Sequence, residues 1–379
     1  MTTTAPQQRS GTLLPSLTGM RFIAAMIVFL FHSTYELPFA NAGMGHASQF
    51  VMQKAGPMAV AFFFILSGFI LTYTWKPGVP ARTFWRRRFA RIFPNHAVAW
   101  AVALVCLLAL GQAVGLDVAL PNLLMLHPWI PRVQNMFSMD VVSWSLACEA
   151  WFYLAAPLLF LLVNKIAERR LWLWAGVVVV AIFLVPLVAN LLPATPMYYT
   201  SPVWRVWLVE LLPVTRALDF FLGMVLARVI KAGKWPGLGV LPSLGIVVLA
   251  YLAGIFVLPV SYGYVAIGTS LALVIGACAA ADIKGRRTPF SSNTMVRLGE
   301  LAFAFYLVHW MVLHFGHLAL GPGRTWDTPT AIGLIALAFV ISAPLAWLLH
   351  TGVERPAEKW ISGRRRPAPR PRPTAAPVS

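Results

Sequence analysis

Charged residues are scarce in this chain. Only 11% of its 379 residues are Asp, Glu, Lys or Arg, against about a quarter in a soluble globular protein. Hydrophobic residues make up 59%, which is more apolar surface than a soluble fold keeps away from water. We therefore interpret the sequence as an integral membrane protein. Its length suits about ten spans of roughly 20 residues each, joined by short loops.

Acidic residues are scarcer than basic ones. The chain has 12 Asp and Glu against 30 Lys and Arg, which gives a net charge of +18. In a soluble protein this excess would suggest nucleic-acid binding. In a membrane protein it is explained by the accumulation of basic residues on the cytoplasmic side, so we expect no nucleic-acid partner.

Cysteine is rare, and the common cofactor motifs are absent from the sequence. The three cysteines, Cys106, Cys148 and Cys278, each lie in an apolar run without metal-site spacing, so we expect free thiols and no metal. The sequence has no phosphate-binding glycine loop, dinucleotide fingerprint or zinc-protease motif. The first apolar run is not typical of a cleaved signal peptide, because Arg21 lies inside it and many similar runs follow.

Ten apolar stretches predict an all-α, polytopic transmembrane helix bundle. The predicted helices are 15–35, 56–75, 95–115, 143–164, 171–192, 211–231, 239–259, 263–282, 298–318 and 329–350. If both termini are cytoplasmic, 25 of the 30 Lys and Arg residues lie inside, as the positive-inside rule requires. Nine or eleven spans remain alternatives, because the loops 116–142 and 193–210 contain apolar turns.

Two short tails flank the predicted transmembrane domain. Residues 1–12 form a polar N-terminal tail, residues 13–360 form the domain, and residues 361–379 are basic and rich in Pro and Arg. We expect the second tail to be disordered and to lie against anionic lipid. The predicted location is the plasma (inner) membrane, with the lipid bilayer around a multi-pass protein.

Ionisable side chains inside the predicted spans are candidate functional groups, because burying them in a membrane is costly. Arg21 and His32 are eleven residues apart on the first span, or about three helical turns, so they share one face. Two interpretations stay open. Arg21 extends to the inner headgroups while His32 lies at the outer boundary, or both residues take part in chemistry.

The fourth and ninth spans carry the other candidates. Glu149 has Ser145 one turn before it and Tyr153 one turn after it, so the three side chains share a stripe. The Glu149 carboxylate needs a partner or a proton, and a structural tie to an arginine is one of its possible roles. Tyr306 lies one turn before His309, which by itself is typical of a core histidine bonded to a neighbouring helix.

Two groups of charges remain. Arg216 and Asp219 stand at i and i+3, so we expect them to pair with each other. Arg86, Arg88 and Arg91 belong to the dense basic segment "TFWRRRFARIFPNH" after the second span. This segment either fixes the topology or clamps a phosphorylated ligand, since arginine binds phosphate with paired donors.

Four sequence blocks together resemble the acyltransferase 3 family of membrane acyltransferases. The blocks are "LTGMRFIAAMIVFLFH", "FFFILSGFIL" followed by "FWRRRFARIFP", "WSLACEAWFYLAAP", and "FYLVHW" with the closing "VERPAEKW". The resemblance extends over about residues 13–360. The chain departs from the pattern at Thr18, where the family usually has an acid, and at Ala150, where it often has a second acid, which weakens any role for these two positions.

The resemblance implies transfer of an acyl group, usually acetyl, from a cytoplasmic coenzyme A thioester to a hydroxyl. His32 would be the catalytic histidine, acting either as the base that deprotonates the acceptor or as a covalent relay of the acyl group. Arg21 would hold the donor phosphates or orient the reacting carbonyl. Glu149 would either hold His32 in its productive tautomer or bind a basic residue.

The resemblance also implies a set of substrate-binding residues and an acceptor. The residues expected to bind the donor or the acceptor are Arg86, Arg88, Arg91, Ser145, Tyr153, Tyr306 and His309. The acceptor would be a cell-envelope carbohydrate or a secondary metabolite such as a macrolide, and "LPSLTGMRF" is more like the antibiotic-modifying branch. The alternative function is a transporter or flippase of a small or lipid-linked substrate.

Overall fold

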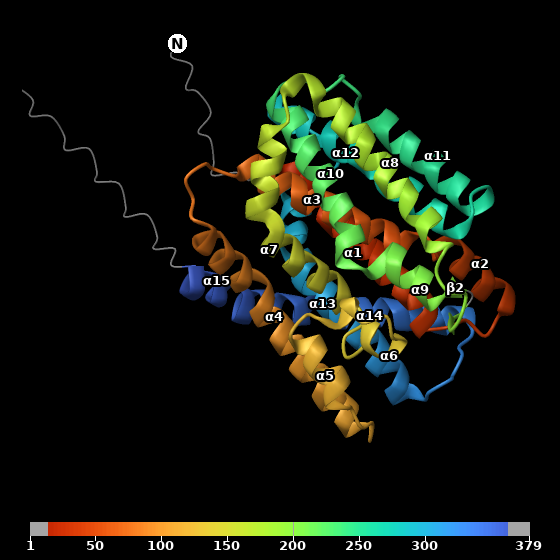
Figure 1. Ribbon diagram of the computed structural model, residues 1–379. Coiled ribbons are helices and arrows are strands. Elements are labelled where there is room, and N and C mark those ends of the chain that lie inside the picture. Colours follow the sequence, from red (N-terminus) through yellow and green to blue (C-terminus); the bar gives the residue numbers. More distant parts are fainter. Residues whose placement is uncertain (1–13, 200, 363–379) are drawn as a thin grey trace, which may run out of the picture.

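The computed structural model describes residues 14–199 and 201–362 and confirms an all-α bundle (Figure 1). The long helices are α1 (Pro15–Glu36), α3 (Ala55–Thr74), α4 (Ala81–Ala109), α7 (Ser143–Lys165), α8 (Leu171–Ala189), α10 (Pro213–Lys231), α11 (Val240–Phe256), α12 (Val260–Ile283), α13 (Asn293–Leu320) and α14 (Thr328–Leu349). The short helices are α2 (Ala42–Met52), α5 (Leu116–Leu123), α6 (Val133–Met136), α9 (Val203–Val206) and α15 (Arg355–Ser362). The remaining elements are the helical turns η1 (His127–Trp129), η2 (Glu168–Arg170), η3 (Trp207–Leu211) and η4 (His350–Glu354), and the antiparallel strands β1 (Met197–Tyr198) and β2 (Ser201–Pro202).

The protein is a multi-pass membrane protein. Within residues 14–199 and 201–362, eight helical segments are long and apolar enough to cross a membrane, and they contain α1, α3, α4, α7, α8, α12, α13 and α14. The other two predicted spans are helical as well. α11 is apolar but only 17 residues long, and α10 includes Arg216, Asp219, Arg228 and Lys231. That all ten helices cross the membrane stays a prediction.

The predicted boundaries of the third span, 95–115, are wrong. α4 begins at Ala81 and ends at Ala109, so the basic segment is the first part of a long helix rather than a loop. Arginine is a good helix former, and its long side chain carries the charge away from an apolar surface. Ala90 and Ile92, on either side of Arg91, are buried against the bundle. Hydropathy alone therefore placed the start of this helix too late.

Most of the two predicted tails lies outside the described residues. This holds for residues 1–12 and for the basic segment from 363 to 379. The predicted start of the second tail at 361 is wrong, because Ile361 and Ser362 still belong to α15. α15 packs against α4, so the end of the domain lies beside the basic part of that helix.

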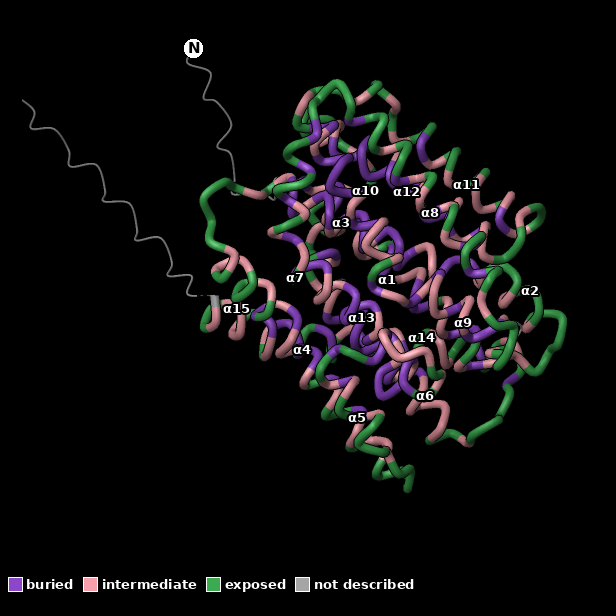
Figure 2. The backbone as a smooth tube through the Cα atoms, viewed as in Figure 1, coloured by how far each residue is buried: buried purple, intermediate pink, exposed green. Residues whose placement is uncertain are grey.

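The buried core lies where α1, α3, α10 and α13 pack together (Figure 2). Lipid is as apolar as a leucine side chain, so helices in a membrane are held by close van der Waals contact, which small residues allow. A Cβ added to Gly299 of α13 would lie 1.9 Å from the Thr18 carbonyl oxygen of α1. A Cβ added to Gly223 of α10 would lie 1.9 Å from the Ile65 carbonyl oxygen of α3. These glycines set the register of the two helix pairs.

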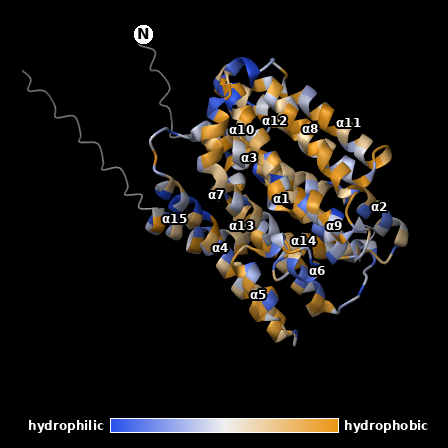
Figure 3. Ribbon diagram, in the orientation of Figure 1, coloured by the Kyte–Doolittle hydropathy of each residue, from blue (hydrophilic) through white to orange (hydrophobic). Residues whose placement is uncertain are grey.

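The outer helices present apolar side chains outward. Leu173 on α8, Leu249 on α11 and Val340 on α14 are exposed, and hydrophobic residues run along α8 and α11 (Figure 3). These faces suit contact with lipid chains. At the ends of the bundle, α2 and β2 lie on the side opposite α15 (Figure 1).

The segment 116–142 is docked into the bundle by buried polar side chains. The side-chain amide of Asn122 donates a hydrogen bond to the backbone carbonyl of Ser138 at 2.9 Å. The backbone carbonyl oxygen of Asn122 lies 3.0 Å from His96 Nε2. Ser143 Oγ lies 3.3 Å from His127 Nε2. Burial lowers the pKa of His127, outside the spanning helices, to about 3, so the ring is neutral near pH 7. This network positions the start of α7.

Candidate active site

A cavity of about 60 Å³ lies among α1, α3, α4, α7 and α13. Its polar lining comes from Arg21 of α1, Arg91 of α4, Ser145 and Glu149 of α7, and Tyr306 of α13. All five were singled out in the sequence as candidate site residues. The fold therefore brings half of the ten candidates to one place.

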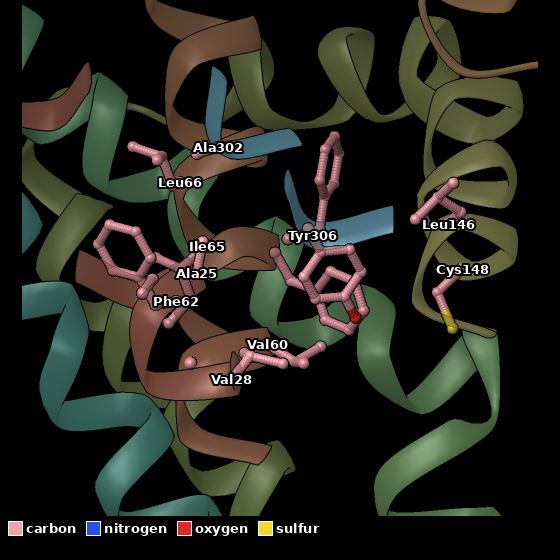
Figure 4. Close-up of a cluster of buried hydrophobic side chains, with 14 of the residues drawn as sticks. Ala25, Val28, Val60, Phe62, Ile65, Leu66, Leu146, Cys148, Ala302 and Tyr306 are labelled. Carbon is pink, nitrogen blue, oxygen red and sulfur yellow. The ribbon is translucent and has the colours of Figure 1, made fainter. Parts of the chain in front are cut away.

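The remaining cavity walls are apolar. Val60 of α3, Leu146 of α7 and Ala302 of α13 line it together with Tyr306 (Figure 4). The Phe63 ring lies 6.0 Å from the Tyr306 ring, measured between centroids. Such walls exclude water, and charges interact more strongly where the dielectric is low.

Two hydroxyl groups hold the Glu149 carboxylate. Ser67 Oγ donates to Oε1 at 2.9 Å, and the Tyr153 hydroxyl donates to the same oxygen at 2.6 Å. The second bond spans one turn of α7, so the predicted stripe is present. Glu149 also interacts electrostatically with Arg21 and Arg91. Two roles were expected for the Glu149 carboxylate, orienting His32 or binding a basic residue. The structure favours the second role.

The partner of His32 is another histidine. The ring of His32 lies 5.4 Å from that of His309 and 4.9 Å from that of Phe31, measured between centroids. His309 is fully buried, and its Nδ1 is 3.2 Å from the Phe305 carbonyl oxygen of its own helix. The sequence predicted that His309 is hydrogen-bonded to a neighbouring helix. This prediction is wrong for Nδ1, whose hydrogen-bond partner belongs to α13 itself.

This hydrogen bond defines the tautomer of His309. A carbonyl oxygen only accepts, so Nδ1 carries the hydrogen and Nε2 keeps its lone pair. Nε2 is buried and has no hydrogen-bond partner among the described residues. It is therefore available to accept a hydrogen bond from His32 or from a substrate.

Tyr306 connects the cavity to the histidine pair. Its hydroxyl lies 2.8 Å from Ser145 Oγ, and its ring lies 5.7 Å from the ring of His309. A continuous line of side chains thus extends from the cavity through Tyr306 and His309 to His32. Arg21 lines the cavity with Ala302 and Tyr306 of α13, and the His32 ring lies beside His309 of the same helix, which agrees with the shared face of Arg21 and His32.

Two polar residues in this region were not singled out by sequence reasoning. Ser67 holds Glu149, as described above. Glu36, one turn after His32, accepts a hydrogen bond from Trp310 Nε1 at 3.0 Å and lies 2.9 Å from His314 Nδ1. The available signals were a serine in an otherwise apolar span and an acid at i+4 from a candidate histidine.

The three candidate arginines of the basic segment, Arg86, Arg88 and Arg91, occupy different places. Arg91 lines the cavity, whereas Arg88 lines a second cavity beside it. The Arg88 guanidinium lies over the rings of Phe84 and Tyr153, at 5.8 Å and 5.7 Å from their centroids. Arg86 is exposed and lines neither cavity. The basic segment is therefore not a single clamp.

The predicted Arg216–Asp219 pair is confirmed. Arg216 Nη2 lies 2.9 Å from Asp219 Oδ2 on α10, and both side chains are largely buried. Neither residue lines the cavity of Arg21 and Glu149. We therefore assign the pair to the fold.

Comparisons with known proteins agree with this geometry. The model of a family described as an acyltransferase domain matches residues 14–351. Acyltransferase MdmB of Streptomyces mycarofaciens is 40% identical over 365 residues, which is 93% of this chain and 94% of that protein. No solved structure matches. The expectation of an acyltransferase enzyme is thereby confirmed, and the chain belongs to the acyltransferase 3 family of membrane acyltransferases.

Proposed function

We propose that this acyltransferase moves an acyl group, acetyl in the simplest case, from a coenzyme A thioester to the oxygen of a hydroxyl acceptor. One observation carries the proposal. A cavity among five helices joins two arginines and a carboxylate to the Ser145 and Tyr306 hydroxyls, and it adjoins the pair His309 and His32.

The donor would arrive at the arginine-rich end of α4. In the proposed topology both termini and this end of the helix are cytoplasmic, where coenzyme A thioesters are found. Arg86, exposed at the surface, would attract the donor phosphates, while Arg88 and Arg91 lie deeper, next to the two cavities. Arginine suits this task because its guanidinium binds phosphate oxygens with paired donors.

Within the cavity, Arg21 would bind the acyl donor at the end away from His32, which stands about three helical turns further along α1. The reacting carbonyl would lie at the Tyr306 end of the cavity, which adjoins His309 and His32. Glu149 would keep Arg21 and Arg91 apart and oriented, because it interacts electrostatically with both. The Tyr306 hydroxyl, which also lines the cavity, would supply a further hydrogen-bond donor.

His32 would act as the base. With Nε2 of His309 accepting a hydrogen bond from one nitrogen of His32, the other nitrogen of His32 is free to take the proton of the acceptor hydroxyl. The acceptor oxygen then bonds to the thioester carbon, and the carbon–sulfur bond breaks. The leaving thiolate takes the proton from His32, so the cycle ends with the imidazole neutral. A histidine suits both steps because its pKa is ordinarily near neutrality.

For the acceptor, we propose a hydroxyl of a secondary metabolite such as a macrolide, or of a cell-envelope carbohydrate, modified at the plasma membrane. The opening segment that resembles the antibiotic-modifying branch supports the first class. Mass spectrometry of metabolites and glycans from a deletion strain tests both. We expect one species to lose the mass of one acyl group. An unchanged profile for both classes would contradict this choice of acceptor.

The reaction itself is tested with purified protein and acetyl-CoA labelled in the acetyl group. We expect release of free coenzyme A and appearance of label either in an added hydroxyl acceptor or, by slow hydrolysis, in acetate. Label retained on the protein would support a covalent relay at His32. Absence of turnover over a panel of acceptors, together with saturable uptake in vesicles, would contradict the proposed reaction.

A further inference from the structure

A second cavity, of about 180 Å³, lies between α4 and α7. Its lining is almost entirely apolar, and the polar groups in it belong to Arg88 and Tyr153. Nothing in the proposed chemistry at Arg21 and His32 uses this space. Its volume is sufficient for a small apolar ligand.

The second cavity adjoins the first one directly. Ile92 of α4 lines both. Tyr153 lines the second cavity and donates a hydrogen bond to Glu149, which lines the first. Ala150, which directly follows Glu149 on α7, also lines the second cavity. A molecule that reacts beside Glu149 can therefore extend into this space.

The cavity opens on the outer face of the bundle. Trp85 and Phe89 of α4 and Leu154 of α7 line it and are 41%, 51% and 57% exposed. These apolar side chains form a mouth that faces the lipid. An occupant must therefore be apolar at this end and polar only toward Arg88 and the first cavity.

The size and lining fit a short hydrocarbon chain. An apolar cavity of about 150 Å³ is known to hold benzene, so about 180 Å³ accommodates a chain of roughly six carbons. Arg88 Nε is buried without a hydrogen-bond partner among the described residues, so the polar end of this space is the end beside Arg88.

We propose that the second cavity binds the carbon chain of the acyl donor, so that the enzyme binds thioesters of four to six carbons more tightly than acetyl-CoA. This inference rests on the proposed use of a coenzyme A thioester. The donor carbonyl lies in the first cavity, and the chain extends past Ile92 and Ala150 to the mouth. A lipid tail has the same chemistry, so the experiment must separate the two sources.

The test is competitive binding of acetyl-, butyryl- and hexanoyl-CoA against labelled acetyl-CoA, with the full-length protein in nanodiscs. Burial of a methylene group tightens binding by up to about fourfold, so we expect hexanoyl-CoA to bind at least about tenfold more tightly than acetyl-CoA. In Ala150→Leu, which fills the cavity, this preference should disappear.

A matched control is Ala155→Leu, a change of the same size on the same helix at a partly buried position that lines neither cavity. It should keep the preference of the wild type, since partition of long donors into the lipid is the same in both variants. If Ala150→Leu does not fold, Met125→Ala serves instead. It enlarges the cavity, so the preferred chain should become longer.

The outcomes separate the two proposals. Acetyl-CoA binding without a chain-length preference, or a preference that both leucine variants share, would overturn the acyl-chain site and leave the cavity to lipid. If no coenzyme A thioester binds the wild type, the proposed function is contradicted and this inference falls with it.

Discussion

The charges on α10 and the charges around the first cavity are arranged in opposite ways. On α10, Arg216 and Asp219 form a closed ion pair at 2.9 Å, on the helix that packs tightly against α3. In the cavity, Glu149 is held by neutral hydroxyls, and Arg21 and Arg91 face the open space. In a closed ion pair each charge is neutralised by a partner within the protein, whereas charges that line a cavity are available to a ligand.

A related contrast holds for the two buried histidine clusters. His127 and His96 are bonded to the Ser143 side chain and the Asn122 backbone in the docked segment before α7. His309 bonds one nitrogen to its own helix, and its ring lies beside those of His32 and Tyr306. Each cluster has one buried ring nitrogen without a partner in the described structure, His127 Nδ1 and His309 Nε2. The clusters differ in position, because the first lines neither cavity and the second adjoins the cavity of Arg21 through Tyr306. The predictions below test this division, from the largest expected effect to the smallest.

His32→Ala should reduce acyl transfer most. Loss of a general base lowers kcat by about 10²–10⁴-fold, and we expect the upper end because His32 is assigned both proton transfers. Expression and thermal stability in detergent should stay near the wild type. The control is His46→Ala, an exposed histidine on α2, which should keep full activity. Loss of folded protein in His32→Ala would make this residue part of the fold instead.

Glu149→Gln and Asp219→Asn should separate activity from stability. Glu149→Gln keeps the shape and removes the charge beside two arginines, so kcat/KM should fall by about 100-fold while the protein stays folded. Asp219→Asn leaves Arg216 without its counter-charge and should cost about 3–5 kcal/mol of stability. Thermal unfolding and initial rates on both variants check this. If both lose stability equally, the contrast between the two regions is wrong.

Arg88→Ala should raise the apparent KM for the acyl donor by about tenfold, because charge-assisted bonds to the donor are lost. The KM for the acceptor should change little. Arg86→Ala, one half-turn away and exposed, should change the donor KM by less than about twofold, as is usual for a screened surface charge. Equal effects from the two variants would mean that the basic segment attracts the donor only by its overall charge.

Gly299→Ala should have the smallest effect on the reaction, through helix spacing alone. The added methyl group meets the Thr18 carbonyl, so α1 must shift, and overpacking costs about 1–3 kcal/mol. We expect kcat to fall severalfold when both substrates are saturating. Gly316→Ala on the same helix meets no atom within 4 Å and should be neutral. Full activity in Gly299→Ala would show that the α1–α13 register does not position His32.

Relationships within one helix could be predicted from the sequence. Periodicity places Arg21 and His32 on one face, Ser145, Glu149 and Tyr153 on one stripe, and Arg216 beside Asp219. The resemblance of four blocks to a known family adds the class of enzyme. Each of these inferences depends on residues that are close in the chain or on short motifs.

Relationships between helices could not be predicted in this way. Ser67 lies 82 residues before Glu149, and the pairing of His32 with His309 joins the first and ninth predicted spans. Hydrophobic periodicity shows which face of a helix is apolar but not which helix packs against it. For the same reason the second cavity and the separate places of Arg86, Arg88 and Arg91 came only from the structure.

The central claim is that the cavity of Arg21, Glu149 and Tyr306 holds the reacting thioester. A cryo-EM structure of the protein with a non-hydrolysable acetyl-CoA analogue tests it most directly. The account predicts density for the carbonyl group in this cavity, with the phosphates near Arg86, Arg88 and Arg91. Density for the analogue at the opposite end of the bundle, beside α2 and the β1–β2 strands, would contradict it.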